Sequence, residues 1–526
     1  MSVPTPARDP RFHLVEAEIL ARAPEHTPQP SLDRVRAVLE LLGDPQRAYP
    51  VVHVTGTNGK TSTARMTDRL LREHGLRTGR FTSPHLSHVG ERITVDGVRL
   101  DEEAFVAAWD DVAPYVELVD ARSQEEGGPR LSFFEVLTCM AFAVFADAPV
   151  DVAVVEVGLG GTWDSTNVAD AAVAVVTPVA LDHERWLGHD VVQIAEQKSG
   201  IVKEGSVLVT AQQPLEVAEV LLRRAAEVGA VVAREGIEFG VVSRDVAVGG
   251  QRLTLKGLVG GADDVYLPLH GAHQAGNAAT ALAAVEAFLG SGGAAGTGLD
   301  PDLVRDAFAH VDVPGRMEPV RRGPLVVVDA AHNPAGAEAL VAGVDEAFPG
   351  TRLVGVVGMM ADKDAAQVLE VLEPALAEVV VTSAPTERAL PAAELAEAAV
   401  GVFGDERVHV HPDLADALDV AVRLADEADP AAGAGAAGVA SGVLVCGSVL
   451  LTAHARRLLG APDPDAVAVD TTSRGVSVVA TDTERQLLGD DWADPGDDRY
   501  EAPDDSVLLD DPWAEPDDDD GGAGRA

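Results

Sequence analysis

Aromatic residues, cysteines and basic residues are all scarce in this chain. Only 4% of its 526 residues are Phe, Trp or Tyr, so Ala, Val and Leu must fill most of the hydrophobic core. Cys139 and Cys446 lie far apart without metal-ligand spacing, which indicates reduced thiols rather than a disulfide or a metal site. The 40 Lys and Arg against 85 Asp and Glu give a net charge of −45, which argues against nucleic acid as a partner.

Long runs of large hydrophobic residues are scarce as well. The longest stretch without Asp, Glu, Lys or Arg, 430–455, is rich in Ala, Gly and Ser rather than in the large apolar residues typical of a membrane span, and residues 1–10 have no apolar core of an export signal. We therefore expect a cytoplasmic protein that is not bound to a membrane, and a monomer. Its composition, 46% hydrophobic and 24% charged, is globular, and its length allows two or three domains.

A β-prone segment leads into a glycine-rich loop and a helical pattern at residues 51–62, VVHVTGTNGKTS. Backbone N–H groups of such a loop can face phosphate oxygens, Lys60 adds positive charge, and the Thr61 hydroxyl can reach Mg²⁺. The usual pattern has its first glycine six residues before the lysine, where this chain has Val54. An ordinary strand-to-helix turn is the alternative, but the context favours a nucleoside triphosphate site.

Polar residues follow three of the predicted strands. Glu156 ends a strongly apolar run, where an unpaired carboxylate would be costly, so it is a candidate Mg²⁺ ligand rather than a simple strand cap. Ser83 and His183 could add an oxygen and a nitrogen ligand. Taken alone, each is more often a turn residue or a structural histidine.

Short apolar runs alternate with helical patterns along most of the chain, which predicts mainly parallel, doubly wound sheets. A helical stripe at 32–42 precedes the glycine-rich loop, and alternating stretches at 236–269 predict a small antiparallel insertion. The runs predicted as buried strands are 150–157, 172–177, 207–210, 325–329, 353–357, 379–382 and 442–446.

A turn-rich joint at 311–316 marks the expected domain boundary. An Ala- and Gly-rich stretch at 430–442 predicts a flexible surface loop, and the acidic composition after about residue 461 predicts disorder. The expected parts are an N-terminal extension at 1–30, an ATP-binding domain at 31–313, a C-terminal domain at 314–460 and an acidic tail at 461–526.

A series of short motifs in this order resembles the folate branch of the Mur ligase superfamily, the dihydrofolate and folylpolyglutamate synthases. The resemblance covers about residues 30–460. The motifs are TGTNGKT at 55–61, TSPHL at 82–86, SFFE at 132–135, EVGLGG at 156–161, DSTN at 164–167, DH at 182–183, IAEQKSGI at 194–201, HQAGN at 273–277, PGR at 314–316 and DAAHNP at 329–334.

The resemblance implies a P-loop Mur-ligase-type ATPase domain with a mainly parallel sheet and a small β-rich insertion, followed by a Rossmann-like C-terminal α/β domain. It implies an ATP-dependent ligase that adds L-glutamate to 7,8-dihydropteroate and to tetrahydrofolates through an acyl phosphate. A monofunctional folylpolyglutamate synthase and another Mur-type amino-acid ligase remain alternatives. A nucleotide-binding regulatory or scaffold protein acting through its acidic tail is an alternative of another class.

The resemblance also assigns roles to residues. Lys60, Lys198, His183 and His332 would be catalytic, and Lys198 would be carbamylated. Two Mg²⁺ ions would be held by Ser83, Glu156, His183 and Lys198. The residues implied to bind ATP are Gly56, Thr57, Asn58, Gly59, Lys60, Thr61, Ser62, Asn277, Arg316 and Asp329.

Phe133, Phe134 and Asp164 are candidates for the substrate pocket, although both phenylalanines could equally belong to the core. Thr162 departs from the family pattern, which usually has Arg there. We expect deletion of 462–526 to leave ligase activity intact.

Overall fold

The structure, a computed structural model, describes residues 10–24, 30–291, 298–427 and 441–465. Nearly all of the predicted loop at 430–442 and the acidic tail after residue 465 lie outside the described residues. All of the described residues belong to one compact unit. Among the described residues, no helix is both long and apolar enough to cross a membrane.

An eight-stranded sheet forms the centre of the N-terminal half, with the order β4-β3-β2-β5-β1-β6-β7-β8. All neighbouring pairs are parallel except those of β3, which runs antiparallel to both β2 and β4. The mainly parallel sheet is therefore confirmed. Its strands are β1 (Val51–Thr55), β2 (Thr78–Phe81), β3 (Ile93–Val95), β4 (Val98–Arg99), β5 (Val152–Glu156), β6 (Val173–Val176), β7 (Val207–Thr210) and β8 (Val231–Arg234).

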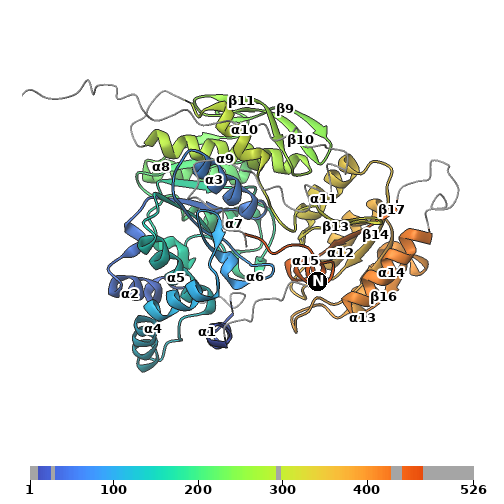
Figure 1. The fold of residues 1–526 in the computed structure, drawn as a ribbon, viewed down its shortest axis with the longest axis horizontal. Coiled ribbons are helices and arrows are strands. Elements are labelled where there is room, and N and C mark those ends of the chain that lie inside the picture. Colours follow the sequence, from blue (N-terminus) through green and yellow to red (C-terminus); the bar gives the residue numbers. More distant parts are fainter. Residues whose placement is uncertain (1–9, 25–29, 292–297, 428–440, 466–526) are drawn as a thin grey trace, which may run out of the picture. The chain divides into compact units, whose positions relative to one another are not determined.

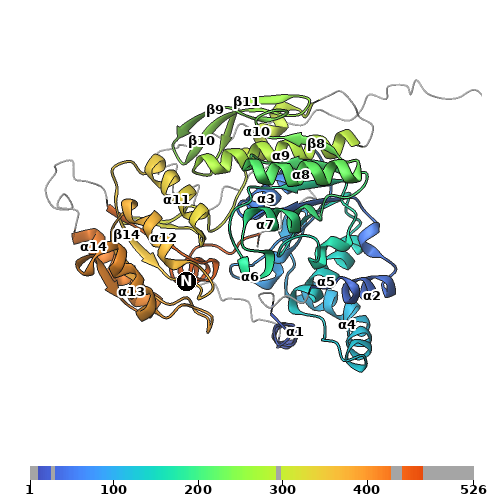
Figure 2. The ribbon, with the colours of Figure 1, turned by 180° about the vertical axis from the view of Figure 1, so that it is seen from behind.

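Helices cover both faces of this sheet (Figures 1 and 2). Alternate residues of β1 point to opposite faces, so Val52 packs in the core under α3 and α9, whereas Val51 packs under α2, α4 and α5. The helices are α1 (Pro10–Leu20), α2 (Asp33–Leu41), α3 (Lys60–Glu73), α4 (Glu102–Glu125), α5 (Phe133–Asp147), α6 (Glu184–Leu187), α7 (Val191–Ser199), α8 (Leu215–Val228), α9 (Ala272–Ser291) and α10 (Pro301–Ala309).

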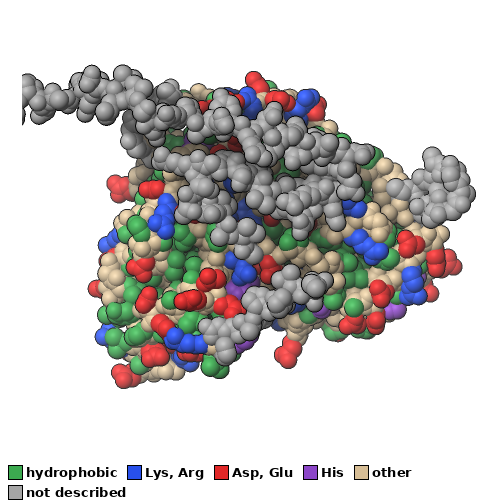
Figure 3. Space-filling view, in the orientation of Figure 1, with side chains coloured by type: hydrophobic (Ala, Val, Ile, Leu, Met, Phe, Trp, Pro, Cys, Tyr) green, Lys and Arg blue, Asp and Glu red, His purple; other side chains and the backbone are tan. Residues whose placement is uncertain are grey.

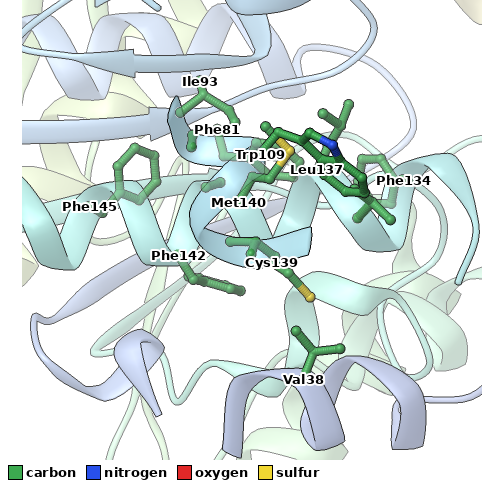
Figure 4. Close-up of a cluster of buried hydrophobic side chains, with 14 of the residues drawn as sticks. Val38, Phe81, Ile93, Trp109, Phe134, Leu137, Cys139, Met140, Phe142 and Phe145 are labelled. Carbon is green, nitrogen blue, oxygen red and sulfur yellow. The ribbon is translucent and has the colours of Figure 1, made fainter. Parts of the chain in front are cut away.

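The scarce aromatic residues gather around α5 (Figure 4). Phe81, Trp109, Phe142 and Phe145 are all buried there, together with Cys139. Because α5 is apolar over most of its surface, it is buried against the sheet on one side and against α2 and α4 on the other. The N-terminal end of α5, with Phe134, is thereby held rigidly.

The antiparallel insertion predicted within 236–269 is confirmed. It is a three-stranded sheet of order β11-β10-β9, formed by β9 (Gly240–Ala247), β10 (Gly250–Lys256) and β11 (Gly261–Leu267). Its apolar side chains, such as Leu253 and Val265, join the core around α9.

A six-stranded sheet organises the C-terminal half, with the order β12-β13-β17-β14-β15-β16 and only β12 antiparallel. Helices α11, α12 and α13 pack on one face, and α14 and α15 on the other. The elements are β12 (Glu318–Arg322), β13 (Leu325–Val328), α11 (Pro334–Ala347), β14 (Arg352–Val357), α12 (Ala365–Leu372), β15 (Leu376–Val381), α13 (Ala392–Phe403), β16 (Val408–Val410), α14 (Leu414–Glu427), β17 (Ser441–Cys446) and α15 (Val449–Leu458).

The start of the predicted acidic tail is packed against the rest of the chain. The Asp465 carboxylate pairs with Arg65 and Arg80, and the Pro462 carbonyl accepts a hydrogen bond from Arg456. The prediction that disorder begins at 461 is therefore wrong for 461–465, because these residues have charged partners that composition alone does not reveal. Elsewhere, acidic and basic side chains are interspersed on the face seen in Figure 3.

Candidate active site

The glycine-rich loop joins the end of β1 to the start of α3. Gly59, the residue before α3, has φ +87°, and a Cβ there would lie 2.5 Å from Oδ1 of Asn277, so the loop requires glycine at this position. Lys60 folds back over the loop, and its Nζ donates to the carbonyls of Gly56 (3.2 Å) and Thr57 (3.0 Å). Burial lowers the pKa of Lys60, although Glu156 and Asp182 oppose the shift.

Glu156 lies beside this loop because β5 pairs with β1, with Glu156 opposite Val54. Its carboxylate accepts hydrogen bonds from the Thr61 hydroxyl (2.9 Å) and the Ser83 N–H (3.2 Å). Burial raises the pKa of Glu156, and the nearby charge of Lys60 opposes this. A hard cation favours such a group of hydroxyl and carboxylate oxygens, so the residues present fit Mg²⁺.

A cavity of about 710 Å³ opens in front of the loop and brings together residues far apart in sequence. Asn277 comes from α9, Arg316 from the joint before β12, and His332 from the segment after β13. Among the predicted residues, those lining this cavity are Thr57, Asn58, Gly59, Lys60, Thr61, Ser62, Ser83, Glu156, Asn277, Arg316, Asp329 and His332.

His183 and Lys198 line a small neighbouring cavity with Gly56 and Lys60. Nζ of Lys198 donates to the Gly56 carbonyl (2.7 Å), and burial, reinforced by Lys60, lowers the pKa of Lys198 to about 7. Desolvation by the cleft walls lowers the pKa of His183 to about 3 despite the adjacent Asp182, so the imidazole is neutral at pH 7. Both side chains can therefore offer a nitrogen lone pair.

The described residues contain no group of three or more His, Cys, Asp and Glu side chains placed to hold a metal ion. The predicted set has only Glu156 and His183 of these types. It depends on Ser83 and on modification of Lys198 for its other donors.

Asp182, which the motif placed beside His183 without a role of its own, is a hub of contacts. Its Oδ2 accepts a hydrogen bond from Nδ2 of Asn333 (2.9 Å) and pairs with Nε2 of His332 (3.3 Å), and its Oδ1 pairs with Lys363. Burial alone would raise the pKa of Asp182. The His332 hydrogen bond and the charges of His183, His332 and Lys363 outweigh burial and hold the pKa well below its usual range.

Asn333 also exchanges side-chain hydrogen bonds with Asn58 of the glycine-rich loop, at 3.1 and 3.2 Å. The segment after β13 thus contacts both the loop and Asp182. These contacts bring His332 into the cavity in front of Lys60.

A second cavity, of about 310 Å³, adjoins the first. Thr57, Lys60, Ser83 and His332 line both cavities. The second cavity is also lined by the half-buried rings of Trp163 and Trp186 and by Phe134, Asp164, Met360 and Arg388.

Phe133 lies elsewhere. It lines neither of these cavities, and its buried ring packs under the guanidinium of Arg92, 4.9 Å from the ring centroid. Its selection as a substrate residue is therefore corrected to a core residue, because adjacent residues of α5 point in different directions. Phe134 does reach the cavity, and the Asp164 carboxylate accepts the backbone N–H of Leu159 (2.9 Å).

Thr162, which replaces the family's usual arginine, holds α7 in place. Its backbone N–H and its hydroxyl both donate to the Gln197 carbonyl, at 2.9 and 3.0 Å. The adjacent Gly161 and Gly200 allow this close approach, since a Cβ on either would lie within 3 Å of the opposite backbone. The loop after β5 therefore supports the helix that carries Lys198.

Comparison with known proteins agrees with this geometry. Residues 315–448 match the family described as Mur ligase, glutamate ligase domain. The chain is 50% identical over 469 residues to the dihydrofolate synthase/folylpolyglutamate synthase of Mycobacterium tuberculosis, covering 87% of this chain and 96% of that protein. The chain belongs to the dihydrofolate synthase/folylpolyglutamate synthase family.

Solved structures of this family share the fold. The Mycobacterium tuberculosis folylpolyglutamate synthase complexed with ADP and AMPPCP has a TM-score of 0.81 and 48% identity, covering 86% of this chain and 99% of that one. A folylpolyglutamate synthase complexed with AMPPCP and folate has a TM-score of 0.73 and 29% identity, with coverage of 85% and 99%. As a family member, the chain is an ATP-dependent folate–glutamate ligase.

Several residues that line these cavities were not among the predicted site residues. Asp182 had a usable signal, since an acidic residue follows a predicted strand at the edge where ligands bind. Trp163 had a similar signal, as it lies inside the glycine-rich segment after Glu156. Lys363 and Arg388 lie in segments without a recognisable motif, and only the folded chain brings them to the second cavity.

Proposed function

We propose that this chain transfers the γ-phosphoryl group of ATP to the carboxylate of 7,8-dihydropteroate or a tetrahydrofolate and then joins L-glutamate to it. The observation that carries the proposal is the meeting of two cavities at Lys60, Ser83 and His332. The larger cavity contains the glycine-rich loop, and the smaller one has flat rings and an acidic side chain suited to a pterin. Both lie within the size range of ligand sites, about 300 to 1,000 Å³.

In the first step, an oxygen of the substrate carboxylate attacks the γ-phosphorus, and the bond to the β-phosphate oxygen breaks. This gives an acyl phosphate and ADP. Lys60 faces the cavity from the first turn of α3 and would neutralise charge on the transferred group. Asn277, Arg316 and Asp329 line the same cavity and would bind ATP together with residues 56–62.

In the second step, the glutamate amine attacks the acyl carbon, loses a proton and displaces inorganic phosphate. No protein nucleophile is required, so the side chains act by positioning and by charge. His332 lies where the two cavities meet, and contacts of its Nδ1 with the Ala330 carbonyl and of its Nε2 with Asp182 hold its ring there. We assign it a positioning role beside the reacting phosphoryl group.

Ser83, Glu156 and His183 would hold Mg²⁺, which when bound would neutralise phosphate oxygens. The neutral imidazole of His183 and the buried carboxylate of Glu156 suit this role. A carbamate on Lys198 would add an anionic oxygen donor for a second ion. Its formation joins the neutral amine to CO₂ with release of one proton, and a lysine pKa of about 7 supplies that neutral amine near physiological pH.

Phe134 and Asp164 would line the pterin end of the substrate site, and we add the rings of Trp163 and Trp186. Stacking on a flat indole ring suits an aromatic bicycle, and a buried acid can pair with its ring N–H groups. Burial raises the pKa of Asp164. A cytoplasmic location and a monomeric state stay predictions, and the net charge of −45 supports small molecules rather than nucleic acid as partners.

The test is purified protein with ATP, Mg²⁺ and L-glutamate, offered 7,8-dihydropteroate or tetrahydrofolate in turn, with products identified by mass. Addition of glutamate to both acceptors is expected. Addition to tetrahydrofolate alone would identify a monofunctional enzyme. ATP turnover without addition to either acceptor would overturn the proposal in favour of a nucleotide-dependent regulatory protein.

A further inference from the structure

Asp465, close to the end of the described chain, is inserted between two buried arginines. Its carboxylate accepts from Nη1 (2.6 Å) and Nη2 (3.0 Å) of Arg65 and from Nη2 of Arg80 (2.6 Å). The side chains of Arg65 and Arg80 are only 8% and 2% exposed. The contact is therefore a desolvated ionic cluster rather than a surface salt bridge.

Backbone contacts hold Asp465 in this position. Its carbonyl accepts the N–H of Arg99 (3.0 Å), and the Pro462 carbonyl accepts from Arg456 of α15 (3.0 Å). Asp465 adopts φ +55°, a left-handed conformation that non-glycine residues seldom adopt and that tertiary contacts must maintain.

The two arginines belong to the elements that carry the phosphate-binding residues. Arg65 lies one turn after Thr61 on α3, and Arg80 lies on β2, three residues before Ser83. Thr61 and Ser83 both donate to Glu156, so the spacing between α3 and the end of β2 sets the shape of this acidic site. Asp465 bridges these two elements through both arginines, beside the ion pair that Asp68 of α3 makes with Arg80 (3.1 Å).

The same cluster reaches the joint between the two halves of the chain. Nε of Arg65 donates to the carbonyl of Asp312 (2.9 Å). A pocket adjoining the cluster is lined by Thr61, Arg316 and Asp465, so the carboxylate lies behind the cavity that we assign to ATP.

We propose that Asp465 is a positioning residue for the ligase reaction: by bridging Arg65 and Arg80 it fixes α3 against β2 and so holds Thr61 and Ser83 in the geometry that ATP and its metal require. This inference rests on the proposed function, since it assigns the larger cavity to ATP. It makes Asp465 part of the catalytic unit.

The experiment compares full-length wild type, Asp465→Asn and the control Asp463→Asn, all at a temperature where each is folded. Asp463 is half exposed, and its carboxylate lies 3.8 Å from Arg99. We expect Asp465→Asn to lower kcat/KM for ATP at least about tenfold, mainly through KM, with little change in KM for glutamate, because a loss of this size needs only about 1.4 kcal/mol. The control should match wild type.

Arg65→Gln and the double variant Arg65→Gln/Asp465→Asn complete a double-mutant cycle. Positioning through Arg65 requires that the two substitutions be strongly non-additive in kcat/KM for ATP. The double variant lacks the Arg65 cation that Asp465→Asn leaves unpaired. If Asp465→Asn alone does not fold, the double variant is compared directly with wild type: a raised KM for ATP supports the inference, and a wild-type KM overturns it.

A lowered melting temperature with wild-type kcat and KM in the folded variant would overturn the inference, because Asp465 would then be structural only. Failure of both Asp465→Asn and the double variant to fold would overturn it as well. If wild type itself adds no glutamate, the proposed function fails instead. The two failures are therefore distinguishable.

Discussion

Lys198 is buried, and its Nζ donates a hydrogen bond to the Gly56 carbonyl of the phosphate-binding loop. We expect Lys198→Ala to lower kcat by at least about a hundredfold, as loss of a metal ligand or of its direct support does. Activity of the wild type should depend on added bicarbonate after CO₂ removal, and it should rise from pH 6 to pH 8, because only the neutral amine forms a carbamate.

Lys256→Ala is the matched control for this prediction. Lys256 lies on β10 and donates to the Ile237 carbonyl, away from the cavities. Wild-type turnover in Lys198→Ala, measured by glutamate addition, would remove the lysine from the mechanism. If the wild-type rate does not depend on CO₂, the carbamate is excluded, but a role for the lysine itself is not.

Asp182 should stabilise the fold in a pH-dependent way. Its folded pKa lies below the value of about 3.9 for an unfolded chain, so its contribution is complete above that pH and is lost as the pH falls below it. We expect Asp182→Asn to cost about 3 kcal/mol at pH 7, because Lys363 loses its buried counter-ion.

Urea unfolding of wild type and Asp182→Asn between pH 3 and pH 7 measures this difference. The difference in unfolding free energy between the two proteins should become smaller as the pH falls toward 3. Asp170→Asn is the control, since Asp170 is 76% exposed in its pair with Lys203. A pH-independent difference would show that the carboxylate charge is not the source of the stabilisation.

At the scale of elements, the turn from β1 into α3 requires glycine at position 59. We expect Gly59→Ala to raise KM for ATP at least about tenfold and to cost about 1–2 kcal/mol of stability, because φ +87° is strained for alanine and the new Cβ would meet Asn277. Asn277 would have to leave its place in the ATP cavity.

Gly75→Ala separates strain from displacement of Asn277. Gly75 follows the same helix with φ +80°, and nothing lies within 4 Å of a Cβ there. It should lower the melting temperature while leaving KM for ATP unchanged. Equal effects of both variants on KM would contradict a specific role for the loop glycine.

Elements with strong local patterns were predictable from sequence. The run 207–210 is β7, and the stripe at 32–42 contains α2, because buried parallel strands and amphipathic helices leave clear apolar patterns. The loop of residues 55–61 was recognisable because each of its residue types serves phosphate binding. Phe133 and Phe134 could not be told apart, since a helix buried on most sides has no distinctive face.

Contacts between distant segments could not be read from sequence. Asp182 meets Lys363 across 181 residues, and Asp465 meets Arg65 across 400. Such pairs depend on strand order and on the packing of helices against two sheets. The sequence around a single charged residue does not indicate which distant residue it will contact. For this reason the acidic composition of the segment did not indicate that Asp465 pairs with Arg65 and Arg80.

At the scale of the whole molecule, the two ends of the acidic C-terminal segment should behave differently when removed. Deleting 466–526 should leave kcat/KM for ATP within about twofold of the full chain, because the described contacts to Arg65, Arg80 and Arg99 are made by Asp463 and Asp465. Deleting 462–526, expected from sequence to be harmless, removes those contacts and should lower kcat/KM like Asp465→Asn. Measuring glutamate addition by both truncated proteins locates the end of the functional enzyme: equal, wild-type rates would place it before residue 462, and loss in both would place it after residue 465.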